Sequence, residues 1–135
     1  MRYLLDTNIC IYLIKEQPPQ VRARLAPLAL GDVLMSALTY AELWHGVMRC
    51  GPAVQTAAEH ALRGLVARIP VLDFNAASAE QYGVLAAPTA QHRRNLIDRL
   101  IAAHALAARL ILVTHNEADF RDIEGLTIEN WARAE

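Results

Sequence analysis

The stretch Arg2-Tyr3-Leu4-Leu5-Asp6-Thr7-Asn8, close to the start of the chain, decides the fold. Its apolar run from residue 3 to residue 5 is short and bounded by polar residues, which is typical of a buried strand in a parallel sheet. Asp6 directly follows this run, at the carboxyl end of the predicted strand, where ligands bind in open α/β sheets. A carboxylate there needs a helix cap, a cation or a metal as its partner, because burying an unpaired charge is costly. The simplest alternative is that Asp6 or Thr7 only caps the following helix.

Strands and helices are predicted to alternate along the rest of the chain. We expect further strands at 33–36, 70–72, 110–113 and 126–128, and helices at 9–15, 21–28, 39–50, 54–66, 75–86 and 96–109. Residues 114–120 are expected to form a loop or a single turn. Such alternation predicts the α/β class, with a parallel sheet of four to five strands and helices on both faces. No linker or internal repeat divides residues 1–135, so a single domain is predicted.

The composition narrows the classes of function. The chain has 135 residues, of which 54% are hydrophobic, so it can bury a core of its own. Its net charge is −1, so any site for a polyanion must be local or based on a metal. The two cysteines, Cys10 and Cys50, are too few for a disulfide scaffold and lack the spacing of metal ligands. Neither a membrane-spanning run of roughly 20 apolar residues nor a signal peptide is apparent, so we expect a cytoplasmic protein.

Four acidic residues fall where this architecture gathers side chains. Asp6 ends the first strand, and Glu42 is expected in the first turn of the helix after the second strand. Asp98 lies near the start of the helix that precedes strand 110–113, and Asp119 follows that strand. Acids at neighbouring strand ends repel one another unless a cation neutralises them. Clustered carboxylates suit Mg²⁺ or Mn²⁺, and such a site can activate water for attack on phosphorus.

Each acid also has a purely structural explanation. Thr39-x-x-Glu42 fits a capping box, in which Glu42 reaches back to the backbone N–H of Thr39. The helix dipole favours Asp98 in a first turn, and Asp119 is an ordinary turn residue. Taken singly, these explanations are at least as good as a catalytic role. Taken together they are less satisfactory, because four acids are expected to converge.

Four sequence blocks resemble those of the PIN-domain family, in the same order and spacing. The closest likeness is to the VapC-type toxins of bacterial toxin–antitoxin pairs, and the final Ile128-Glu129-Asn130-Trp131 is similar to the end of that subgroup. The resemblance spans nearly the whole chain. The four blocks are Leu4-Leu5-Asp6-Thr7-Asn8, Thr39-Tyr40-Ala41-Glu42-Leu43, Asp98-Arg99-Leu100-Ile101-Ala102-Ala103-His104-Ala105 and Leu112-Val113-Thr114-His115-Asn116-Glu117-Ala118-Asp119-Phe120.

The resemblance implies the toxin of a type II toxin–antitoxin system. Such a protein is a Mg²⁺- or Mn²⁺-dependent endoribonuclease that cleaves RNA phosphodiesters through a metal-bound water. The resemblance also implies a cognate VapB-type antitoxin and a homodimer, for which helix 54–66 and the short N-terminal helices are candidate interfaces. Carried over, the four acids are the catalytic and metal-binding residues: Asp6 and Asp98 are the most direct ligands, while Glu42 and Asp119 act through water or a second ion. Polar residues that match the supporting positions are Thr7, Asn8, Thr114 and Asn116.

The chain departs from the family pattern just before Asp98, where relatives often carry a Gly and a small polar residue. Here Arg93 and Arg94 precede Asn95. These two arginines, with Arg99, are candidates for contacts to RNA phosphates, and a solvated basic helix start explains them equally well.

The histidines and the aromatic side chains are given no part in catalysis. We expect His104, in an Ala-rich helix, to be a packed core residue, and we assign His115 no catalytic role although it lies nearer the predicted site. Tyr12, Tyr40 and Trp44 are interpreted as core, with contacts to the antitoxin as the alternative.

Two other functions share features with this sequence. An aspartyl-phosphate phosphohydrolase also begins with an acid after an apolar strand, but its sites typically have Asp-x-Asp, and here the second position is Asn8. A catalytically inactive PIN domain that serves as a protein-binding module is the other alternative. The presence of all four acids counts against it.

Overall fold

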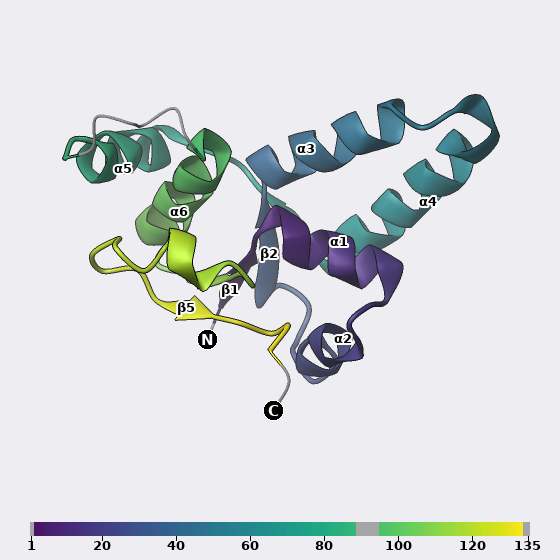
Figure 1. Ribbon diagram of the computed structural model, residues 1–135, viewed down its shortest axis with the longest axis horizontal. Helices are drawn as coiled ribbons and strands as arrows, with labels where there is room; N and C mark the ends of the chain where they lie inside the picture. The colour runs from purple at the N-terminus through teal and green to yellow at the C-terminus, as the bar shows by residue number, and fades with distance from the viewer. Residues whose placement is uncertain (1, 89–94, 134–135) are drawn as a thin grey trace.

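The computed structural model describes residues 2–88 and 95–133, and a five-stranded sheet lies at its centre (Figure 1). All neighbouring strands pair in parallel, in the order β3-β2-β1-β4-β5. The predicted α/β class with a parallel sheet is confirmed. The strands are β1 (Tyr3–Leu5), β2 (Val33–Ser36), β3 (Val71–Leu72), β4 (Ile111–Val113) and β5 (Ile128–Glu129).

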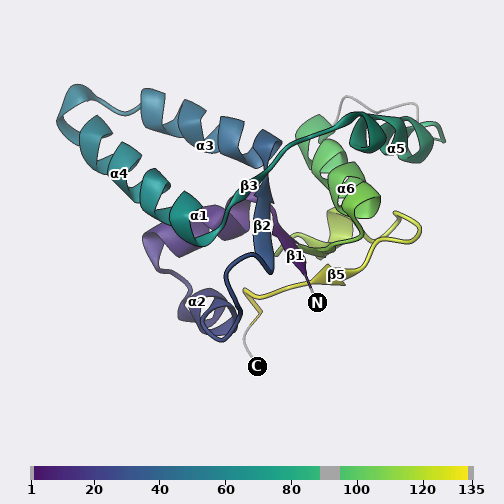
Figure 2. The same cartoon turned by 180° about the vertical axis from the view of Figure 1, so that it is seen from behind.

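The helices flank the sheet in two groups. Figures 1 and 2 show α3 and α4 as a hairpin that projects on one side of the molecule, whereas α5 and α6 pack together on the other. Among the described residues, no helix is long and apolar enough to cross a membrane. The helices are α1 (Thr7–Lys15), α2 (Pro19–Leu25), α3 (Ala37–Met48), α4 (Pro52–Arg68), α5 (Ala76–Ala86), α6 (Leu96–Ala108) and the short 3₁₀ helix η1 (Glu117–Asp119).

Two hydrophobic cores lie on opposite faces of the sheet. Side chains alternate between the faces along a strand, so neighbouring residues of β1 enter different cores. Leu5 packs in a core that includes Met35 and residues of α1 to α4. Leu4 packs in the other, with Leu34 and residues of α6. Because both faces of the sheet are covered, the strands consist of consecutive apolar residues. This pattern explains why they could be predicted from the sequence.

The start of α3 differs from the sequence-based expectation. The helix begins at Ala37, because the side chain of Ser36 accepts a hydrogen bond from the backbone N–H of Leu38 (3.0 Å) and caps the first turn. The expected start at Thr39 is wrong, and so is the capping box between Thr39 and Glu42. Glu42 consequently lies in the second turn of the helix, where its carboxylate has another partner.

Smaller differences affect other helix ends. α1 starts at Thr7 and not at residue 9, because Asp6 is its cap. α2 spans Pro19–Leu25 and not 21–28, with a proline in its first turn, where the missing N–H costs nothing. Gly31 adopts φ +96°, a left-handed conformation that suits glycine, as the chain turns into β2.

Candidate active site

The carboxyl ends of three central strands meet at one edge of the sheet, because the strands are parallel and in register. A polar residue stands at each end: Asp6 after β1, Ser36 at the end of β2, and Thr114 after β4. The backbone N–H of Asp6 donates to the carbonyl oxygen of Val113 (3.0 Å), which continues the ladder between β1 and β4 to this edge. Polar side chains are thus gathered at one place in an otherwise apolar sheet.

Asp6 is buried at this edge, with 4% of its surface exposed. One carboxylate oxygen, Oδ1, accepts a hydrogen bond from the backbone N–H of Ile9 (3.0 Å), so Asp6 does cap α1. Burial raises the pKa of Asp6 to about 6, although hydrogen bonds from Thr114 and Ile9 favour the ionised form. The negative charge of Asp98 raises this pKa further. Asp6 therefore does more than cap α1, because its ionised form is destabilised by the charge of a second acid, Asp98.

Asp98 lies in the first turn of α6 and is half-buried. Its pKa is raised first by burial and then by the negative charges of Glu42 and Asp119. The four predicted acids are thus linked electrostatically, because Asp98 interacts with each of the other three. They come from four separate segments: the end of β1, the middle of α3, the start of α6 and η1.

Glu42 is exposed on α3 and is held by a side chain of α1. The Thr7 hydroxyl, which has a single proton, donates to the Glu42 carboxylate. The same hydroxyl lies 3.2 Å from the hydroxyl of Thr39, which is fully buried. This contact places Thr7, a predicted supporting residue, against Glu42, a predicted acid. Thr39 faces the Thr7 hydroxyl and does not cap α3.

Asp119 is held by the turn that follows β4. The side-chain amide of Asn116 donates to the Asp119 carboxylate, and the backbone N–H of Asn116 donates to the Thr114 hydroxyl (3.0 Å). Thr114 and Asn116 therefore connect Asp119 to Asp6. Asn8, the fourth predicted supporting residue, is exposed and makes no side-chain hydrogen bond to another described residue.

The donor set at this edge consists of carboxylate oxygens, which suit hard divalent cations such as Mg²⁺ and Mn²⁺. In the described part of the chain, no three His, Cys, Asp or Glu side chains are already arranged to hold a metal ion. Three of the acids instead contact protein donors, Asp6 facing Ile9, Glu42 facing Thr7, and Asp119 facing Asn116. The donor chemistry and the repulsion around Asp98 fit a cation.

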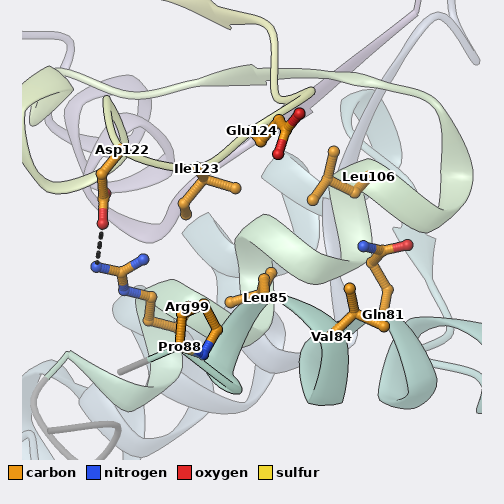
Figure 3. A pocket seen from close by; sticks show the side chains of 9 residues that line it. All are labelled: Gln81, Val84, Leu85, Pro88, Arg99, Leu106, Asp122, Ile123 and Glu124. Carbon is orange, nitrogen blue, oxygen red and sulfur yellow. Dashed lines mark hydrogen bonds and ion pairs between the residues drawn. The ribbon is translucent and has the colours of Figure 1, made fainter. Parts of the chain in front are cut away.

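Arg99 directly follows Asp98 in α6, and its charge is paired. Its guanidinium contacts the Asp122 carboxylate (3.2 Å) across a cavity of about 430 Å³, which also has walls formed by Leu85 of α5 and Ile123 (Figure 3). Its role in contacting RNA stays a prediction. Arg93 and Arg94, the other predicted contacts, lie outside the described residues.

Two histidines make contacts that the sequence did not indicate. His104 is buried, as predicted, and its Nδ1 lies 2.8 Å from the hydroxyl of Ser36, so it connects α6 to the start of α3. Burial lowers the pKa of His104. His115 is exposed, and its positive charge lowers the pKa of Asp6. Nothing in the local pattern pointed to either contact, because both join segments far apart in the chain.

Comparison with known sequences gives a consistent result. The sequence model of a family described as "PIN domain" matches residues 3–126. A protein of Shigella flexneri named tRNA(fMet)-specific endonuclease VapC is 37% identical over 134 residues, covering 98% of this chain and 99% of its own. Ribonuclease VapC2 of Rickettsia felis is 36% identical, covering 97% of this chain and 98% of its own.

Solved structures show the same fold. The chain superimposes with a TM-score of 0.83 on a chain of the VapBC2 structure from Rickettsia felis, described as bound to a DNA fragment from its promoter, at 32% identity over 97% of this chain and 99% of the other. It matches a chain of VapBC-1 from nontypeable Haemophilus influenzae equally well, with a TM-score of 0.83 and 33% identity over 98% of this chain and 100% of the other.

Proposed function

Because this chain belongs to the PIN-domain family and matches VapC proteins over nearly its whole length, we propose that it is the toxin of a type II toxin–antitoxin system and acts as a Mg²⁺- or Mn²⁺-dependent endoribonuclease. The relatives bear the names ribonuclease and endonuclease, which supports RNA as the substrate. With RNA and an antitoxin as its two partners, the protein would act in the cytoplasm.

The observation that carries the proposal is the gathering of carboxylates from four separate segments, which Asp98 links electrostatically. Burial first, and then the charges of neighbouring acids, raise the pKa values of Asp6 and Asp98, so the folded chain holds these carboxylates at a cost. Proteins retain such a cost at functional sites, and a divalent cation would remove it. Asp6 and Asp98 are the residues that would hold the cation, while Glu42 and Asp119 act through water or a second ion.

The chain's own residues would prepare the site for RNA cleavage. A bound divalent cation supplies charge that offsets the phosphodiester and makes a water more acidic. Thr7 and Asn116 orient the carboxylates of Glu42 and Asp119 through their hydrogen bonds. Thr114 holds the Asp6 carboxylate at the strand end. Because each of these donors lies in a segment next to a strand end, the carboxylates are kept at this edge of the sheet.

The local contacts of Asp6 weigh against the phosphohydrolase alternative. An aspartate that takes up a phosphoryl group must expose a carboxylate oxygen to attack phosphorus. Asp6 is 4% exposed and its Oδ1 caps α1. A carboxylate held in this way suits a ligand better than a nucleophile.

We further propose a VapB-type antitoxin and a second copy of the chain as protein partners. Solved structures that this chain resembles include one described as a toxin–antitoxin complex from Klebsiella pneumoniae and one described as a member of the VapBC family of toxin–antitoxin systems from Mycobacterium tuberculosis, which supports the antitoxin. Exposed apolar side chains lie at the far end of the α3–α4 hairpin, where Met48 is 63% and Val54 is 54% exposed. This end of the hairpin, which includes the start of helix 54–66, suits a protein interface.

The proposal is tested by incubating the purified protein with total RNA in Mg²⁺, in Mn²⁺ and in EDTA. We expect discrete RNA fragments with either cation and none with EDTA, and activity should return when the cation is restored in excess. RNA that stays intact with both cations would favour the inactive binding module. Cleavage that persists in EDTA would overturn the role given to the four acids.

A further inference from the structure

A second cavity opens between α1, the turn after β4 and the C-terminal segment. We call it the Tyr12–His115 pocket, and it is lined by Tyr12, His115, Glu117, Asn130 and Arg133. Its volume of about 420 Å³ lies in the range that small-molecule sites occupy. These side chains come from α1, from the turn after β4 and from the C-terminal segment after β5, which runs past α2 in Figure 1.

The walls of the pocket combine aromatic rings with fixed charges. The rings of Tyr12 and His115 meet edge to face, with centroids 5.5 Å apart and planes at 62°. Glu117 accepts hydrogen bonds from the side chains of Asn130 (3.0 Å) and Arg133. The same amide nitrogen of Asn130 lies 3.5 Å from the carbonyl oxygen of His115, so the turn and the C-terminal segment are held together. The pocket is thus preformed by contacts among its own residues.

Some polar groups that line the Tyr12–His115 pocket remain free to hydrogen-bond a ligand. Among the described residues, neither the Tyr12 hydroxyl nor the His115 ring nitrogens hydrogen-bond to another side chain, and His115 is exposed. Glu117 presents a carboxylate to the pocket, held in place by the Asn130 amide and the Arg133 guanidinium. Only one of its oxygens, Oε2, receives these bonds, which leaves Oε1 as an acceptor.

The pocket is connected to the predicted active site. His115 directly follows Thr114, which stands at the end of β4 beside the end of β1, where Asp6 lies. Tyr12 lies six residues along the helix that Asp6 caps, about 9 Å at 1.5 Å per residue. An RNA strand that passes both sites would place a phosphate at the acids and a neighbouring nucleotide at the pocket.

We propose that the Tyr12–His115 pocket binds one unpaired base of the RNA substrate, and that a base with amino groups on its Watson–Crick edge binds better than uracil. The proposal rests on the function proposed above. An exposed aromatic face such as that of His115 stacks on any base, whereas a carboxylate accepts hydrogen bonds from amino groups of guanine, cytosine or adenine. Glu117 supplies the selectivity, and the His115 ring, supported by Tyr12, supplies most of the affinity.

The first test measures binding without catalysis. The full-length protein in EDTA is titrated with GMP, AMP, CMP, UMP or ribose 5-phosphate, and the ring signals of Tyr12 and His115 are followed by NMR. We expect the signals to shift with the first three nucleotides, less with UMP, and not with ribose 5-phosphate. His115→Ala should weaken binding roughly tenfold, whereas His60→Ala, at an exposed site on α4, should not change it.

Glu117→Gln separates selectivity from stacking. It should reduce the preference for GMP over UMP while the Tyr12 signals still shift, because the rings are retained. Ring signals that do not shift with any nucleotide would overturn the proposal. Ring signals that shift equally with ribose 5-phosphate would also overturn it, and would reveal a phosphate site instead.

A second test keeps this inference distinct from the proposed function. A pool of random-sequence RNA is cleaved by the parent protein, His115→Ala and His60→Ala, and the fragment ends are sequenced. We expect the parent and His60→Ala to share a base preference near the cut, and His115→Ala to lose it. Cleavage with unchanged preference in His115→Ala would overturn the pocket and leave the ribonuclease in place. Nucleotide binding by a parent that cleaves no RNA would support the pocket and refute the ribonuclease.

Discussion

The hydroxyl of Thr7, in the first turn of α1, donates a hydrogen bond to the carboxylate of Glu42 in the second turn of α3. These residues are 35 positions apart in the chain, and their contact connects the helix after β1 to the helix after β2. Because Glu42 is otherwise exposed, this hydroxyl decides where its carboxylate points. The contact explains why a threonine directly follows Asp6.

Replacing Thr7 with valine tests this contact. The variant keeps the shape of the side chain and removes the proton that Glu42 receives. We expect RNA cleavage to fall roughly tenfold, equivalent to about 1.4 kcal/mol of lost positioning, with little change in the unfolding midpoint. Thr56→Val, at an exposed site on α4, is the matched control and should cleave normally. Full activity in Thr7→Val would show that Glu42 needs no positioning.

The raised pKa of Asp6 predicts how stability depends on pH in the absence of metal. The folded chain holds the Asp6 proton up to about pH 6, whereas an unfolded aspartate releases it near 3.8. The free energy of unfolding should therefore fall as pH rises from about 4 to about 6 and stay level above, with up to about 3 kcal/mol from this group. Urea unfolding in EDTA across this range measures the slope.

Asp6→Asn should flatten that slope, because asparagine cannot ionise yet still caps a helix. Asp32→Asn, at the opposite end of β2, should keep it. An unchanged slope in Asp6→Asn would mean that another group is responsible.

Asp98 is predicted to lower the free energy of unfolding of the metal-free protein and to be required for RNA cleavage. Its carboxylate is repelled by Glu42 and Asp119, so Asp98→Asn should raise the unfolding free energy of the metal-free protein at pH 7 and abolish detectable RNA cleavage. Thermal unfolding in EDTA and a cleavage assay measure the two effects. Asp122→Asn, which removes the partner of Arg99 but none of the four acids, is the control. A destabilised Asp98→Asn protein would contradict the predicted repulsion.

The Ser36 hydroxyl has two roles, as the cap of α3 and as the partner of His104. Ser36→Ala should cost about 1–3 kcal/mol, because it removes a cap and leaves a buried imidazole unpaired. Asn75→Ala, which removes the cap of α5, should cost about 1 kcal/mol and leave cleavage intact. Cleavage should fall only in Ser36→Ala, because His104 connects the helices that carry Asp98 and Glu42. Equal effects of the two variants on cleavage would argue against this connection.

The parallel sheet could be predicted from the sequence because its strands are buried on both faces. Leu4 and Leu5 point into different cores, so β1 is apolar throughout and ends visibly at Asp6. The start of α3 was mispredicted for a physical reason: Ser36 and Thr39 both carry a hydroxyl that can cap a helix, and only the end of β2 selects Ser36. Local pattern cannot make that choice.

The acids of the candidate site were predicted from their places at strand ends, and the structure links all four through Asp98. Their supporting contacts could be predicted only in part. Thr7 and Asn116 reach acids, as the resemblance implied, whereas Asn8 is exposed. The contact between His104 and Ser36 spans 68 positions, and such long-range pairs are set by packing, which leaves no local signature.

The most direct test of the central claim compares RNA cleavage by the parent protein, Asp6→Asn and Asp32→Asn in Mn²⁺. Asparagine retains the cap of α1 and removes the charge that would hold a cation, so Asp6→Asn should be folded and inactive. Asp32→Asn carries the same substitution at the other end of the sheet and should cleave like the parent. Cation-dependent cleavage by folded Asp6→Asn at the parent's rate would contradict the account, because the four-acid site would then not be the site of RNA cleavage.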